Sequence, residues 1–180
     1  MKPLFFLLAV FFAQTVQAEP YQYTVHPGDV LDISVWKEEA LQRELRVLPD
    51  GSISFPLAGV INVGGKSLSD VQKELSQKIS EFVPEPVVNI SVKSTEGNAV
   101  YVIGQVKTPG RFVMYLPMDV MQVLSLAGGL TPFAKSNDII ILRRAEGASK
   151  SIEFKYSDIA NGENMDENHL LKTGDVVVVP

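Results

Sequence analysis

Paired carboxylates are the side chains of this chain that most readily suggest chemistry, because two acidic groups on either side of a sugar can hydrolyse a glycosidic bond. The candidates are Glu38 with Glu39, Asp29 with Asp32, and the group Glu163, Asp166 and Glu167. The first pair follows an expected strand end, the second spans a turn and a strand start, and the third lies in Asn- and Gly-rich sequence. Solvated surface charge accounts for all three, so we expect no catalytic residue.

Other reactive groups are sparse. His26 lies beside a turn and His169 in a polar segment, and neither has a metal-ligand partner at helical or hairpin spacing. The chain has no cysteine, which excludes thiol nucleophiles, thiolate zinc sites and disulfides. Neither Gly64-Gly65 nor Gly128-Gly129 completes a phosphate-binding loop motif. We expect no metal, no cofactor and no enzymatic activity.

Trp36 is a candidate residue for contact with a glycan or with another subunit. It is the single tryptophan, and it follows an expected strand and precedes Lys37-Glu38-Glu39. An exposed indole at this position would stack on a sugar ring or pack at a subunit contact. A core or edge position is the alternative.

Residues 1–18 have the pattern of a secretory signal peptide. Lys2 is followed by the apolar run LFFLLAVFF, and Val16 and Ala18 occupy the small-residue positions of a cleavage site. The run is too short for a spanning helix of about 20 residues, although an uncleaved anchor is the alternative. We therefore expect export to the periplasm, and association with the outer membrane without a lipid anchor because no cysteine is present to carry one.

Charge and length narrow the function classes. The 180 residues carry a net charge of −5, and the longest basic run is Arg143-Arg144. Binding to a nucleic-acid backbone needs several converging cations, so nucleic acid is not an expected partner. Two halves of about 80 residues meet at the polar stretch 94–98, and each is marginal as a single core.

The first half, 19–96, combines short strands with one helix. Val30–Val35, the segment 53–57 and Val60–Val63 have strand patterns. The spacing of Ser67 and Asp70 predicts a helix start. Apolar residues then follow at helical spacing and form a stripe along one face of the expected helix. Two prolines end this helix, and a further strand is expected over 87–92. The stripe comprises Leu68, Val71, Leu75, Ile79 and Phe82.

The second half, 97–180, repeats this organisation. Strands are expected over 100–104 and 111–114, a helix over 118–127, a buried central strand over 139–142, a weaker strand over 151–154 and a final strand over 176–179. The word Gly-Asp-Val precedes a strand at both 28–30 and 174–176, which indicates shared turn chemistry. The expected fold class is α+β, with two small mixed α/β domains, the C-terminal one a β-grasp.

Ordered motifs in both halves resemble a known family. The stretch 23–33, then Pro49-Asp50-Gly51, the segment 55–59 and the capped helix resemble the polysaccharide export (Wza-type) domain. The segments 102–106, 109–110, 126–130 and 172–176 resemble an SLBB domain, a β-grasp module named for soluble ligand binding. The motif residues are interpreted as structural: Pro27, Gly28, Asp29, Pro49, Asp50, Gly51, Gly104, Pro109, Gly110, Gly128, Gly129, Gly174 and Asp175.

The resemblance implies a non-enzymatic component of a conduit for capsule or exopolysaccharide. Polysaccharide is the implied cargo, a homo-oligomeric ring the implied assembly, and a separate outer-membrane β-barrel and inner-membrane export components the implied partners. Longer family members carry a lipidated Cys, further SLBB modules and a C-terminal amphipathic helix, and this sequence shows none of them. We therefore expect a short member acting as a periplasmic ring or adaptor. A monomeric periplasmic glycan-binding module and an exported glycan hydrolase or lyase are the alternatives.

Overall fold

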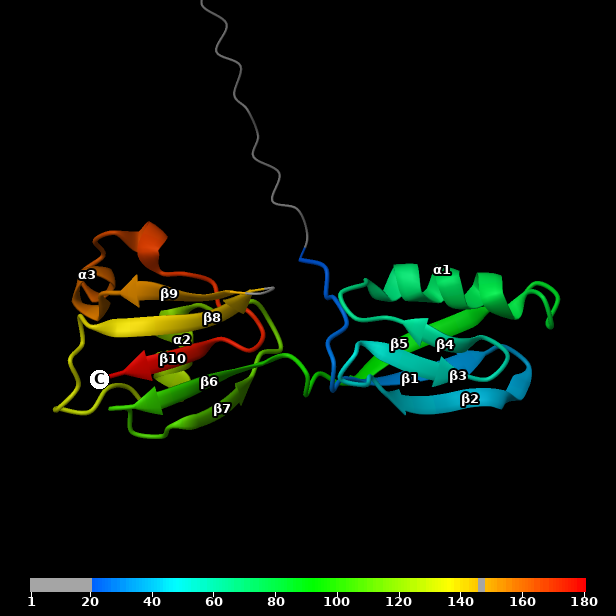
Figure 1. The fold of residues 1–180 in the computed structure, drawn as a ribbon, viewed down its shortest axis with the longest axis horizontal. Coiled ribbons are helices and arrows are strands. Elements are labelled where there is room, and N and C mark those ends of the chain that lie inside the picture. The colour runs from blue at the N-terminus through cyan, green and yellow to red at the C-terminus, as the bar shows by residue number, and fades with distance from the viewer. Residues whose placement is uncertain (1–20, 146–147) are drawn as a thin grey trace, which may run out of the picture.

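The computed structural model describes residues 21–145 and 148–180, which form two bodies side by side (Figure 1). Each body has its own hydrophobic core, one built from residues 25–92 and the other from residues 100–179. The predicted signal peptide, 1–18, lies outside the described residues. The expected domain boundary at 96/97 falls between the two cores and stays a prediction.

The N-terminal body packs one helix and one hairpin against a three-stranded sheet. The sheet has the order β2-β1-β5 with antiparallel pairs throughout, and β3 and β4 form the separate antiparallel hairpin. Its elements are β1 (Val30–Val35), β2 (Glu38–Arg46), β3 (Ser52–Phe55), β4 (Gly59–Asn62), α1 (Leu68–Ile79) and β5 (Val88–Ser94).

Helix α1 begins where the sequence predicts. The Ser67 side chain accepts a hydrogen bond from the Asp70 backbone N–H, as an N-cap should. Val71, Leu75 and Ile79 are buried against the sheet. The extension of the stripe to Phe82 was wrong, because the helix ends at Ile79 and the Phe82 side chain is 60% exposed. The apolar spacing continues to Phe82 in the sequence, but Pro84 and Pro86 follow too closely for the helix to extend that far.

The C-terminal body is a five-stranded sheet with a helix across one face. The strand order is β7-β6-β10-β8-β9, in which β10 runs parallel to β6 and all other pairs are antiparallel. Its elements are β6 (Ala99–Gly104), β7 (Gly110–Val113), α2 (Val120–Leu126), β8 (Ile139–Ala145), β9 (Ala148–Phe154), α3 (Tyr156–Ala160), the 3-10 turn η1 (Met165–Glu167) and β10 (Val176–Val179). This is the predicted β-grasp arrangement, and the α+β class is confirmed.

The sheet of the C-terminal body has one covered and one open face. Helix α2 buries Val120, Val123 and Leu124 against the inward side chains of the sheet. The expectation of a fully buried central strand over 139–142 was wrong in part: Ile139 and Ile141 are buried, whereas Leu142 is 40% exposed on the other face. Strand β8 is an interior strand that pairs with β10 on one side and β9 on the other, and β10 is the middle strand of the five. Helix α2 lies behind the sheet in Figure 1, so the open face is turned toward the viewer.

No helix in 21–145 or 148–180 is long and apolar enough to cross a membrane.

Candidate functional site

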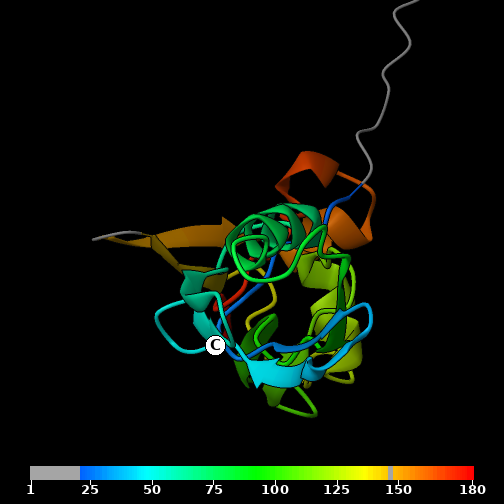
Figure 2. The ribbon, with the colours of Figure 1, turned by 90° about the vertical axis from the view of Figure 1, so that its right-hand side faces the viewer.

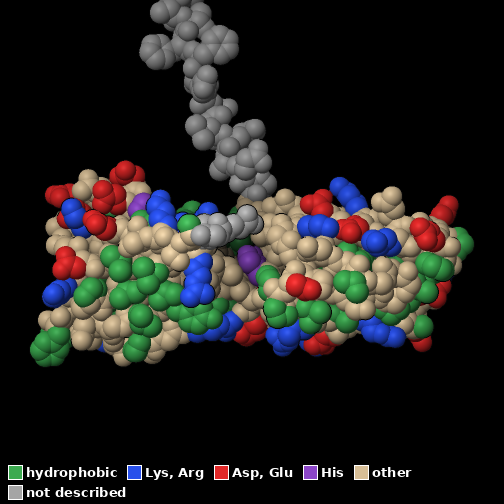
Figure 3. Space-filling view, viewed as in Figure 1, with side chains coloured by type: hydrophobic (Ala, Val, Ile, Leu, Met, Phe, Trp, Pro, Cys, Tyr) green, Lys and Arg blue, Asp and Glu red, His purple; other side chains and the backbone are tan. Residues whose placement is uncertain are grey.

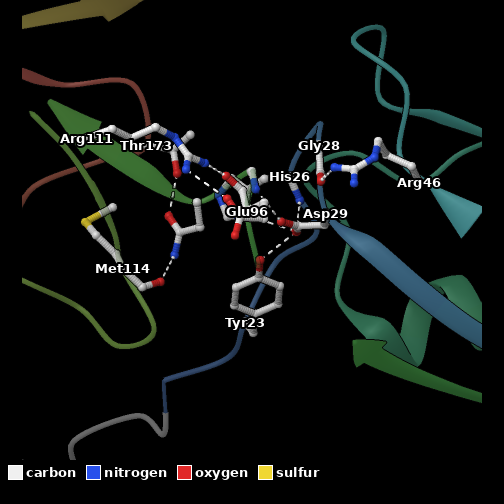
Figure 4. A network of polar contacts seen from close by, with 11 residues as sticks. Tyr23, His26, Gly28, Asp29, Arg46, Glu96, Arg111, Met114 and Thr173 are labelled. Carbon is white, nitrogen blue, oxygen red and sulfur yellow. Dashed lines mark hydrogen bonds and ion pairs between the residues drawn. The ribbon is translucent and has the colours of Figure 1, made fainter. Parts of the chain in front are cut away.

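A buried carboxylate holds the junction between the two bodies. Asp29 sits in the turn before β1, and its side chain is fully buried. Its Oδ2 accepts hydrogen bonds from the Tyr23 hydroxyl at 2.6 Å and from the His26 backbone N–H at 2.8 Å, and its Oδ1 accepts one from the Gly97 N–H at 3.0 Å (Figure 4). Burial and the bond to Asp29 raise the pKa of Tyr23. Asp29 therefore joins the N-terminal body to the connecting segment, residues 95–98, which links β5 to β6.

Asp175 occupies the equivalent turn before β10. Its backbone N–H bonds to the Lys172 carbonyl at 3.0 Å and its Oδ2 accepts from the Lys172 N–H at 2.8 Å, the same pattern that joins Asp29 to His26 at 3.1 and 2.8 Å. The predicted shared turn chemistry of the two Gly-Asp-Val words is thus present. Asp175 differs in its further partner, since it holds the Arg143 guanidinium through Nε at 2.9 Å and Nη2 at 2.6 Å, which raises the pKa of Arg143.

The connecting segment is fixed from both sides. The Asn98 side chain is buried, donates to the Met114 carbonyl at 2.6 Å and accepts from the Thr173 hydroxyl. Arg111 on β7 pairs with the Glu96 carboxylate at 2.8 Å (Figure 4). A methyl group on Gly97 would lie 2.3 Å from the Pro27 carbonyl oxygen, so only glycine fits this close approach. These contacts set the relative position of the two bodies.

The motif residues lie in turns and at element ends. Asp50, in the Pro49–Gly51 turn, accepts from the Ser52 hydroxyl and N–H, and these bonds lower the pKa of Asp50. Pro27 and Gly28 precede Asp29, Pro109 and Gly110 lead into β7, Gly128 and Gly129 follow α2, and Gly174 precedes Asp175. These positions agree with the structural role that the sequence suggested, which stays a prediction because no substitution has tested it.

Within the part of the chain that the structure describes, the acidic candidates lie in separate places, in β1 and the turn before it, at the start of β2 and around η1. Asp29 is engaged in the junction, and Glu163, Asp166 and Glu167 are exposed around η1. Across the described residues, no group of three metal-ligating side chains is close enough to hold an ion. The His26 side chain is only 22% exposed, and burial lowers its pKa. The sequence did not indicate this burial, because Tyr23 and Asp29 reach His26 only through the folded turn.

Trp36 lies at the far tip of the N-terminal body, in the turn between β1 and β2. Its side chain is 72% exposed, so the core alternative was wrong. It lines a depression of about 380 Å³ together with Glu38, Glu39 and the exposed Val87. The indole is thus available for a contact, and Lys37 lines the same depression beside the two glutamates.

Comparison with known proteins identifies both bodies. A family model described as polysaccharide biosynthesis/export protein matches residues 17–93, and one described as SLBB domain matches residues 98–179. The chain combines an export domain of the polysaccharide biosynthesis/export family with an SLBB domain. Together the two matches cover both bodies in the family's order, which confirms the resemblance drawn from the motifs.

Curated proteins similar to this chain are named for the export, transport or production of polysaccharides. The chain is 29% identical, over 89% of its length, to the EPS I polysaccharide export outer membrane protein EpsA of Ralstonia nicotianae. It is 28% identical, over 78% of its length, to the polysialic acid transport protein KpsD of Escherichia coli, and 28% identical, over 68%, to the exopolysaccharide production protein ExoF of Rhizobium meliloti.

The matched relatives are longer proteins. The chain spans 52% of EpsA, 25% of KpsD and 31% of ExoF. The names of these relatives describe polysaccharide export, transport and production, which agrees with the expectation that this protein is not an enzyme.

Proposed function

We propose that this protein is a non-enzymatic component of a polysaccharide export conduit, acting in the periplasm next to the outer membrane. The observation that carries this proposal is the match of the N-terminal body to a polysaccharide export model and of the C-terminal body to an SLBB model. Capsular or extracellular polysaccharide is the cargo. An inner-membrane export component and a separate outer-membrane pore are the partners, and the signal peptide at 1–18 delivers the protein to this compartment.

The protein assembles in this proposal as a closed ring of identical subunits. A ring requires a heterologous contact, in which one surface of a subunit meets a different surface of the next. The described residues expose two apolar surfaces that suit such a contact, one on each body. The tip surface holds Trp36 and Val87, both mostly exposed, and the second surface is the open sheet face of the C-terminal body.

Part of that sheet face is suited to the subunit contact. Val178 on β10 lies in register with Ile103 on β6 and with Ile140 on β8, so the three side chains form an apolar row across the sheet. Ile103 is 48% exposed and the other two are half-buried. We call these three residues the far row, because they lie at the end of the sheet away from the junction. We assign the far row to one side of the heterologous contact and the Trp36 tip to the other.

The oligomeric state of the purified protein tests the ring. Mass photometry of the wild-type chain should give one discrete assembly of several subunits, and Trp36→Ala should shift it toward monomer. Tyr115→Ala is the matched control, because it also removes an exposed aromatic side chain but lies outside the Trp36 depression and outside the far row. A wild-type monomer that binds glycan saturably would instead favour the glycan-binding module.

A further inference from the structure

The junction end of the open sheet face carries a second row of side chains. Val176 on β10 lies in register with Tyr101 on β6 and with Leu142 on β8. Tyr101 is 42% exposed and Leu142 40%, and Val176 is half-buried between them. Figure 3 shows the apolar side chains gathered over this sheet, with basic side chains between them and the neighbouring body.

Two depressions meet at Tyr101 and form one groove. The first, about 640 Å³, lies between the two bodies, with Gly28 and Gly97 on its walls. The second, about 450 Å³, continues along the sheet beside Leu142 and Val176. Tyr101, Thr173 and Gly174 line both. Each volume is in the range of about 300–1,000 Å³ that is typical of small-molecule sites.

The groove is basic although the chain is acidic. Arg46 and Arg111 border the first depression and Arg144 borders the second, whereas Glu96 is the one acidic residue on either lining. Arg143 also lines the second depression, but its charge is balanced by Asp175. Three arginines against one glutamate leave two positive charges in the groove of a chain with a net charge of −5.

Three separate elements supply these arginines. Arg46 ends β2 of the N-terminal body, Arg111 lies on β7, and Arg144 lies near the end of β8. The β8–β9 hairpin projects away from the helix-covered side of its sheet (Figure 2). Arg46 also donates to the Gly28 carbonyl at 2.9 Å, so its position depends on the same turn that holds Asp29 (Figure 4). The groove therefore exists only when both bodies are in place.

The chemistry of this lining selects a ligand class. A guanidinium carries five N–H donors in a planar fork that fits a carboxylate. Arg46 uses one donor on the Gly28 carbonyl, and Arg111 uses one on the Glu96 carboxylate and one on the Glu96 backbone carbonyl. An exposed tyrosine ring offers an apolar face to the C–H face of a sugar. Carboxylates and apolar ring faces alternate along a uronic-acid polymer. A groove with arginines on both sides of an aromatic and aliphatic row matches that alternation.

We propose that this groove binds acidic saccharide units of the exported polymer, with Arg111 and Arg144 contacting carboxylates and Tyr101 contacting a sugar ring. This inference rests on the proposed export function and adds the substrate class and the residues that recognise it. The far row of the sheet remains for the subunit contact.

Calorimetric titration of the purified full-length chain tests the proposal with three probes. Tetragalacturonate carries both sugar rings and carboxylates, maltotetraose carries rings alone, and pentaglutamate carries carboxylates alone. Tetragalacturonate should bind at least about tenfold more tightly than either of the others, because only it engages the arginines and Tyr101 together. Its affinity should fall when NaCl is raised from about 50 to about 300 mM.

Variants locate the site. Arg144→Gln and Arg111→Gln should each weaken tetragalacturonate binding about fivefold. Arg43→Gln is the matched control, since Arg43 is an exposed arginine on β2 that lies outside both depressions. Tyr101→Leu should weaken tetragalacturonate and leave the weak binding of pentaglutamate unchanged. Arg111 takes part in the hydrogen bonds that hold the connecting segment, whereas Arg144 takes part in none of those described. The Arg144 variant therefore tests the groove even if Arg111→Gln disturbs the fold.

Several results would overturn the inference. Equal affinity for maltotetraose would remove the role of the arginines, and equal affinity for pentaglutamate would indicate an acidic protein segment as ligand. An equal loss in Arg43→Gln would show that general charge, not the groove, attracts the probe. Failure of these titrations leaves the export function standing, because that function is tested separately by polymer secretion from a deletion strain.

Discussion

Three glycine-to-alanine substitutions in the C-terminal body separate backbone strain from steric contact. Gly104, at the end of β6, has a φ of +96°, and a methyl group there would lie 2.0 Å from the Val179 carbonyl oxygen. Gly129, after α2, has a φ of +84° but open space around an added methyl group. Gly110, at the start of β7, has neither constraint. The three positions therefore form a graded series.

The expected costs follow from these geometries. A left-handed φ costs an alanine about 1–2 kcal/mol. At Gly104 the methyl group must also push the end of β6 away from β10, which breaks the 2.8 Å bond from the Gln105 N–H to the Val179 carbonyl and costs about 1 kcal/mol more. We expect losses in the free energy of unfolding of about 2–3 kcal/mol for Gly104→Ala and about 1–2 kcal/mol for Gly129→Ala. Gly110→Ala should be neutral or stabilise by about 0.5 kcal/mol.

Urea unfolding followed by circular dichroism measures these differences. Trp36 is the single tryptophan and lies in the N-terminal body, so its fluorescence reports on the unfolding of that body. The urea midpoint from fluorescence should therefore change less in these variants than the midpoint from circular dichroism. A loss below about 1 kcal/mol for Gly104→Ala would refute the steric argument. So would a cost for Gly110→Ala as large as that for Gly104→Ala.

Three further predictions concern the junction and the surface. Asp29→Ala leaves three hydrogen-bond donors without their acceptor and should lower the free energy of unfolding by about 3 kcal/mol in urea titrations; a loss under about 1 kcal/mol would contradict the assigned contacts. Burial lowers the pKa of His26 in the fold, so the unfolded chain binds more protons below about pH 6.5 and stability should fall as the pH drops through that range. His26→Gln should make this fall shallower, and an unchanged pH profile would exclude His26 as its source. Lys93→Ala, which removes the exposed ion pair with Glu44, should leave the urea midpoint unchanged, whereas a clear shift would show that this surface pair matters.

Local sequence signals predicted the turns and helix starts well. The Ser67 cap and the two Gly-Asp-Val turns are short-range features, because each carboxylate or hydroxyl bonds to a backbone N–H three residues away. Strand β2 was missed because its sequence, EEALQRELR, is charged and only Leu41 is fully buried. This pattern is typical of an edge strand, which pairs on one side and needs no continuous apolar alternation.

Contacts between distant segments could not be predicted from the sequence. Arg143 and Asp175 are 32 residues apart and meet only because β8 pairs with β10. The Asp29 contact with the Gly97 N–H spans 68 residues and depends on how the two bodies sit together. The arginine groove has the same origin, since Arg46, Arg111 and Arg144 carry no shared motif and converge through topology alone.

Secreted polysaccharide is the most direct test of the central claim. The extracellular polymer of the native host should be quantified with and without an in-frame deletion of residues 19–180. Export function predicts that the secreted polymer is lost on deletion and restored by the full-length chain supplied in trans. Secretion unchanged in both amount and chain length would contradict a role in the conduit.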